Sequence, residues 1–251
     1  MSDLTNVFTD IADAIRDKTQ TQITYKPVDM ANAINNIQTS VEITSSRLNT
    51  SFNFPVTISN SVTSMYACFQ GFPNFNQPVN IPNSVTNLRG CFASCINFNQ
   101  PVNIPNSVTS MVTCFQSCPS FNQPINIPNG VTNMRTCFQR CLSFNQPVNI
   151  PNSVTDMSSC FSSCSNFNQP VTISSNAIYM SSCFVSCFNF NQPVNIPNSV
   201  TDMTGCFQDC TNFNQPVNIG SNVTNMSNSF RGCVNFNQPV NIPNSVTTMF
   251  N

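Results

Sequence analysis

The chain has 251 residues, of which 14 are Cys and none is His or Trp. Only 7% of the residues are charged, and the formal net charge is −1. A nucleic-acid-binding protein needs a basic patch to neutralise phosphates, and the eight Lys and Arg residues are too scattered to form one. Without His and with so few carboxylates, no acid–base pair or triad can be assembled, so the sequence predicts no enzyme, catalytic residue, metal site or cofactor.

Residues 1–50 differ in composition from the rest of the chain, since they hold four of the eight basic and six of the nine acidic residues. This shift predicts a boundary near residue 45, with a small helical segment at 1–45 and a second domain at 46–251. Apolar residues at spacings of three and four indicate one helix near the start and a second over 27–37. We expect the apolar stripe to anchor the segment to a partner through Phe8, Ile11, Ile15, Met30 and Ile34. Two short helices cannot bury a core of their own, so they should dock on the repeats or on another chain.

The start of the chain lacks the basic residues and the continuous apolar run of a secretory signal. No stretch approaches the roughly 20 apolar residues of a membrane span. We therefore expect a protein made in a cytoplasm, although 14 Cys would otherwise suggest an oxidising compartment.

The second region is a tandem repeat of 23 residues. Its marker is the Phe that opens each FNQP, at Phe75, Phe98, Phe121, Phe144, Phe167, Phe190, Phe213 and Phe236, with Phe52 in a degenerate first copy. A fixed period in this range is typical of a solenoid, in which each turn buries its apolar residues against its neighbours. Nine turns at about 4.8 Å each predict a rod of roughly 40 Å.

Residues 98–120 illustrate one turn. Val102 and Ile104 flank Asn103, an alternation that predicts a short strand with both aliphatic side chains inward and with Pro on either side. Val108, Met111 and Phe115 recur at spacings of three and four, which matches a tight helical turn or an irregular arc. Equivalent residues should stack along the rod, so that Phe98 lies on Phe121.

Polar residues also recur at fixed positions. The outward strand position is a candidate binding row, formed by Asn80, Asn103, Asn126, Asn149, Asn195, Asn218 and Asn241. One of the two rows in FNQ, either Asn or Gln, should turn inward and bond backbone groups along the stack. A competing surface is the variable set after Met and around the Cys pair, with Tyr66, Arg89, Arg135, Arg140, Asp209 and Arg231.

The cysteines form two columns four residues apart within each turn. Packing as small buried apolar residues is one interpretation, supported by Phe72 at one end of a column. Stacked Cα atoms would also fall near the distance window of a disulfide, so a disulfide ladder is a second. Metal binding is the weakest, because there is no His and the spacing is CxxxC.

The recurring FNQP, VTxM and MxxCF elements resemble the BspA-like leucine-rich-repeat surface proteins over about residues 50–251. This resemblance implies a right-handed β-solenoid with a parallel sheet on one side, and a role in adhesion or protein binding. The chain departs from it in carrying Cys where the family often has Met, as at Cys91, and in lacking the Trp loop.

The stretch IADAIRDKTQTQITYKPVDMANAINNI is similar to the starts of phage tail and fibre proteins. The sequence thus favours a virion protein, assembled in the host cytoplasm, that attaches to other virion proteins through residues 1–45. Its solenoid would then contact a host surface protein or glycan. A bacterial BspA-like adhesin and a non-enzymatic protein-interaction scaffold are the alternatives. The chain stops inside a turn without a visible cap, so we expect its last turn to be frayed or covered by another chain, as in an oligomer.

Overall fold

The computed structural model describes residues 52–250, which belong to the compact unit Thr50–Asn251. The helices, the segment 1–45 and the anchor residues Phe8, Ile11, Ile15, Met30 and Ile34 lie outside the described residues. Within residues 52–250 there is no helix, and the named strands are four pairs of residues. They are β1 (Val148–Asn149), β2 (Val171–Thr172), β3 (Val194–Asn195) and β4 (Val217–Asn218).

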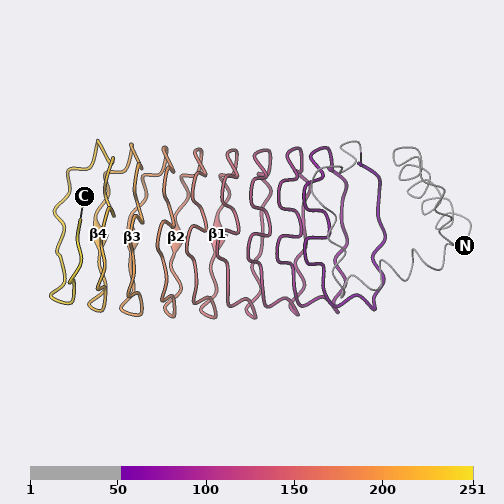
Figure 1. Cartoon of the computed structure of the whole chain (residues 1–251), viewed down its shortest axis with the longest axis horizontal. Coiled ribbons are helices and arrows are strands. Elements are labelled where there is room, and N and C mark those ends of the chain that lie inside the picture. Colours follow the sequence, from indigo (N-terminus) through magenta and orange to yellow (C-terminus); the bar gives the residue numbers. More distant parts are fainter. Residues whose placement is uncertain (1–51, 251) are drawn as a thin grey trace, which may run out of the picture. The chain divides into compact units, whose positions relative to one another are not determined.

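The described residues form a solenoid in which successive turns lie side by side along one axis (Figure 1). β1 pairs in parallel with β2, and β3 with β4, in both cases with residues one repeat apart. Val148 is the partner of Val171, and Val194 is the partner of Val217. The predicted solenoid of 23-residue turns is therefore confirmed, because every turn is in register with the next.

The predicted sheet needs a correction. The strand position pairs over only two residues, and only in the turns that hold β1 to β4. Pro on both sides removes backbone donors, so the ladder cannot extend. A longer ladder runs through the segment after Val–Thr, where parallel bridges link Ser64, Asn87, Ser110, Asn133, Asp156, Tyr179, Asp202, Asn225 and Thr248.

The arc after this ladder is a run of tight turns and not a helix. In the fourth turn, alternate amides donate to carbonyls of the next turn: Met134 to Asp156, Thr136 to Ser158, Phe138 to Cys160 and Arg140 to Ser162, at 2.8–2.9 Å. Between them, the amides of Cys137, Gln139 and Cys141 donate three residues back, as Cys137 does to Met134, and the amide of Arg135 donates to Oδ1 of Asn133 at 2.9 Å. Every amide from 134 to 141 is thus satisfied without a helix, so of the two interpretations of the three- and four-residue spacing the irregular arc is correct and the helical turn is not.

Left-handed residues make this arc possible. In each turn, the residues immediately before the two Cys positions have positive φ, for example Thr136 at 53° and Arg140 at 61°. A residue with positive φ at the third position of a β-turn reverses the chain tightly, as in a type II turn. Two such positions per turn exclude a continuous right-handed helix, and they fold the arc back so that both Cys side chains face the interior.

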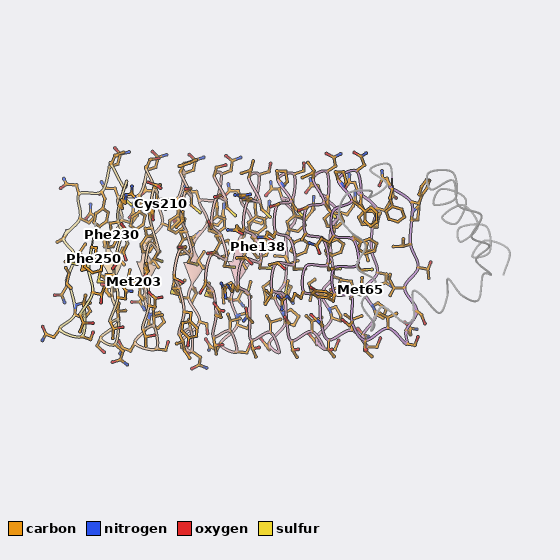
Figure 2. All side chains as sticks on the ribbon, viewed as in Figure 1. Met65, Phe138, Met203, Cys210, Phe230 and Phe250 are labelled. Atoms are coloured by element: carbon orange, nitrogen blue, oxygen red, sulfur yellow. The ribbon has the colours of Figure 1, made fainter. Side chains whose placement is uncertain are left out.

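The core consists of columns that run along the rod. Two adjacent Phe columns form its centre, with Phe98 stacked on Phe121 at 6.0 Å between ring centroids and 10° between planes, as predicted. Neighbouring rings in the two columns are closer, as with Phe115 and Phe121 at 4.3 Å. Val, Ile, Met and Cys columns surround them, and the side chains of Phe138 and Met203 lie inside the stack (Figure 2).

Asn is the row of FNQ that accepts from the backbone of the next turn, although Asn and Gln are both half-buried. The Oδ1 of Asn122 accepts from the backbone amide of Asn145 at 2.9 Å and from Nε2 of Gln146 at 3.1 Å. The same arrangement recurs along the stack, beginning with Asn53 and Asn76. The expectation that one row bonds the backbone is confirmed, and the structure identifies that row as Asn, because its short amide reaches the next amide directly.

The last described turn is bonded but open. The carbonyls of Thr248 and Phe250 accept from the amides of Met226 and Asn228, so this turn is not frayed. Its apolar side chains are nevertheless accessible, with Met249 57% and Phe250 69% exposed (Figure 2). Whether another chain covers them stays a prediction.

Candidate binding surface

One face of the solenoid is built from the strand segment Pro–Val–Asn. In residues 101–103 the Val side chain points inward and is 6% exposed, whereas Pro101 and Asn103 on either side of it are exposed. Alternation along an extended backbone explains this, since successive side chains lie on opposite faces. Repetition in register then aligns the prolines and asparagines in two parallel rows, which we call the Pro–Asn face.

The rows are continuous over the described turns. The proline row is exposed at Pro78, Pro101, Pro124, Pro147, Pro170, Pro193, Pro216 and Pro239. The other row comprises the predicted residues Asn80, Asn103, Asn126, Asn149, Asn195, Asn218 and Asn241, all exposed, with Thr172 in the remaining turn. The structure thus brings the predicted asparagines together in one line, while their role in binding stays a prediction.

A depression crosses this face over four consecutive turns. Its walls are Pro78–Asn80, Pro101–Asn103, Pro124–Asn126 and Gln146–Pro147. Apolar proline rings and neutral amides alternate across it, and none of its lining residues is charged. Such a surface can hydrogen-bond hydroxyl or amide groups while packing against apolar edges, and it offers no group for proton transfer or nucleophilic attack.

The sequence analysis missed the prolines as part of this surface. It assigned them only the effect of limiting the strand. Their position directly before an inward Val places them on the same side as Asn, and that alternation is the signal that could have found them.

The cysteines occupy the interior opposite this surface. All 14 are free thiols and 13 are buried, so the disulfide ladder is absent from this structure. The second column also hydrogen-bonds: the Sγ of Cys141 donates to the carbonyl of Phe115, and Cys164 to Phe138, both at 2.9 Å. Burial raises the pKa of the Cys141 thiol from 9.0 to about 12 and that of Cys68 to about 11. Protonated and enclosed, these thiols are poor nucleophiles.

No group of three or more His, Cys, Asp or Glu side chains within residues 52–250 is arranged to hold a metal ion. Nor does that part of the chain contain a helix long and apolar enough to cross a membrane.

Together, the in-register turns and the uncharged outer rows define a repeat solenoid with one uncharged face of prolines and amides. The chain belongs to the DUF285 family, described as "Mycoplasma protein of unknown function", whose model matches residues 28–149, 128–198 and 180–250. No curated protein matches the chain. The matches do not support the similarity of residues 1–45 to phage tail proteins.

Two solved structures are distantly similar. One is a leucine-rich repeat protein from Bacteroides ovatus, with a TM-score of 0.46 and 18% identity over 76% of this chain and 73% of that one. The other is a leucine rich cell surface protein from Faecalibacterium prausnitzii, with a TM-score of 0.41 and 19% identity over 73% of this chain and 62% of that one. At these values the fold assignment depends on the geometry of the chain itself.

Proposed function

We propose that the chain is a non-enzymatic adhesion protein of the BspA-like leucine-rich-repeat kind, displayed on a bacterial surface, with the Pro–Asn face as its contact surface. The observation that carries this proposal is the pair of exposed, uncharged rows that continue over the described turns. A row of exposed amides, interrupted by Thr172, suits an extended neutral partner, such as a glycan chain or an extended peptide, because successive turns offer the same kind of contact.

The virion hypothesis differs in what the solenoid is attached to. It depends on residues 1–45, for which the comparisons give no support, whereas the DUF285 match covers the repeats on which the adhesin proposal depends. Both hypotheses assign contact to the same solenoid, so a binding experiment on the Pro–Asn face tests their shared part.

The test compares two triple variants of the full chain. Asn103→Ala, Asn126→Ala and Asn149→Ala together remove three neighbouring amides of the Pro–Asn face. Asn83→Ala, Asn106→Ala and Asn129→Ala together remove the same chemistry from three exposed positions in the following turn, where Pro–Asn is followed by Ser or Gly. Labelled proteins are applied to an array of neutral glycans and to immobilised extracellular-matrix proteins.

We expect the first variant to lose at least about tenfold in affinity and the second to bind like the unmodified chain, because repeated weak contacts multiply along a rod. Equal binding by both variants would show that the Pro–Asn face is not the contact surface. A failure of the unmodified chain to bind any target would contradict adhesion itself.

A further inference from the structure

The charges of the described residues are confined to one segment of each turn. They lie between the position before Met in VTxM and the sixth position after it: Arg89, Arg135, Arg140, Asp156, Asp202, Asp209 and Arg231. The Pro–Asn face carries none of them. Met of VTxM is replaced by Leu88 in the second turn. We call the two rows of residues immediately before and after this Met or Leu position the charged face.

The charged face has an ordered pattern. Counting turns from Phe52, Arg89 and Arg135 lie in the second and fourth turns, and Asp156 and Asp202 in the fifth and seventh. The two arginines and the two aspartates are therefore separated by the same two repeats. Parallel bridges through Asp156 and Asp202 hold this segment in register, so the spacing of the charges is fixed at about 4.8 Å per turn.

These charges have no partners of opposite charge within the described solenoid. No ion pair joins them among residues 52–250, and both arginines are exposed. The aspartates are held by neutral donors: Oδ1 of Asp156 accepts from the amide of Ser158, and Oδ1 of Asp202 from the amide of Thr204, both at 2.9 Å. Asp156 also accepts from Nδ2 of Asn133 at 3.4 Å, and Asp202 from the hydroxyl of Thr204 at 2.6 Å. The Arg89 guanidinium lies 5.9 Å from the ring centroid of Tyr66, where stacking leaves its edge free to donate.

We propose that two copies of the chain associate antiparallel through the charged face, with a two-fold axis between the fourth and fifth turns. In this arrangement the second turn of one copy faces the seventh turn of the other, and the fourth faces the fifth. Arg89 then meets Asp202 of the second copy, and Arg135 meets Asp156. The symmetry doubles each contact, which gives four ion pairs. In-register parallel packing would instead place equal charges opposite each other.

Exposed aromatic residues on the same face agree with this arrangement. Tyr179, in the sixth turn, and Tyr66, in the first, are each 51% exposed. Antiparallel packing places Tyr179 opposite the third turn, where Val112 is the outward residue after Met. It places Tyr66 opposite the eighth turn, where Asn225 and Ser227 flank Met226. Both rings would be covered by uncharged neighbours, and tyrosine is enriched in such interfaces.

Charge exchange tests the pairing. R89D/R135D makes the charged face wholly acidic, and D156R/D202R makes it wholly basic. By sedimentation velocity at low ionic strength we expect the unmodified chain to dimerise and each variant alone to be monomeric. An equimolar mixture of the two variants should dimerise again, and added salt should dissociate each dimer. An unmodified chain that stays monomeric at low salt, or a variant that dimerises alone, would overturn the proposal.

Cross-linking tests the orientation, because parallel packing staggered by three turns would also pair these charges. Thr132→Cys introduces an exposed thiol in the fourth turn, next to the proposed axis. Thirteen of the native thiols compete poorly because they are buried, and Cys68 is half-buried. Antiparallel packing brings the two introduced thiols within about one turn, so a short bis-maleimide should link them, whereas Asn149→Cys on the Pro–Asn face should not be linked. A stagger separates the Thr132 positions by about 14 Å along the rod, and the absence of Thr132→Cys dimers would exclude the antiparallel arrangement.

Discussion

The two backbone segments of each turn hold the stack in different ways. The arc of residues 134–141 bonds every second amide to the next turn. The strand segment of residues 147–150 is bounded by Pro and pairs over only two residues. The arc also supplies Phe138 and both thiols to the core, while the strand segment exposes Pro and Asn. The difference indicates that the arc provides most of the stability and that the strand segment is free to serve recognition.

Alkaline pH should have the largest effect, because it lowers the free energy of unfolding through the buried thiols of the arc. Burial raises the pKa of the Cys183 thiol from 9.0 to about 12 and that of Cys233 to about 11. Above pH 9 the unfolded chain therefore releases thiol protons that the folded chain keeps, and the free energy of unfolding falls as pH rises. Each buried thiol contributes up to about 1.4 kcal/mol per pH unit in this window. Urea unfolding at pH 7–10.5 measures the fall.

The range from pH 6 to 8 is the internal control for this titration. The chain has no His and its thiols are protonated there, so the free energy of unfolding should be nearly constant. A curve that stays equally flat from pH 9 to 10.5 would contradict the burial of the cysteine columns.

Phe138→Ala should have the next largest effect. The ring is fully buried and stacks on Phe115, Phe144 and Phe161 at 4.6–5.7 Å between centroids. Its removal leaves a cavity that the stacked turns cannot close, with a loss of about 3–5 kcal/mol in the free energy of unfolding. Tyr179→Ala, at an exposed ring, is the control and should cost less than about 1 kcal/mol. If urea unfolding shows similar losses of free energy for the two variants, the Phe columns are not the centre of the core.

Asn122→Ala and Gln123→Ala distinguish the contributions of the Asn and Gln side chains of FNQ to stability. Asn122→Ala removes the acceptor for the Asn145 amide and should cost about 1–3 kcal/mol, because that half-buried amide loses its partner. Gln123→Ala removes only a side-chain contact to Asn99, so we expect a loss below about 1 kcal/mol. Equal losses in urea unfolding would mean that the Asn row is not the one that holds the backbone.

The sequence predicts those features of the fold that depend on the 23-residue period. A 23-residue repeat without insertions determines which residues stack, so the Phe columns and the exposed Asn row follow from the spacing alone. It does not determine φ, and Thr, Ser and Arg before the Cys positions give no sign of a left-handed backbone. Glycine did give that sign: the four glycines with positive φ, Gly71, Gly90, Gly205 and Gly232, all lie in these two columns. The hydrogen-bonding Asn row could not be chosen over Gln because both side chains can make the same contact.

The smallest predicted effect tests these left-handed positions. Ser163 has φ of 61°, and this conformation costs an L-residue about 1–2 kcal/mol. Ser163→Gly removes that cost and adds about 0.5–1 kcal/mol of backbone entropy to the unfolded chain, so the net gain should be about 0.5–1 kcal/mol. In thermal unfolding this corresponds to a rise of about 1–4 °C. Ser175→Gly, at an exposed position without positive φ, is the matched control and should lower the transition. If both variants lower it equally, the arc does not depend on left-handed residues, and the distinction between a strained arc and a relaxed strand segment is lost.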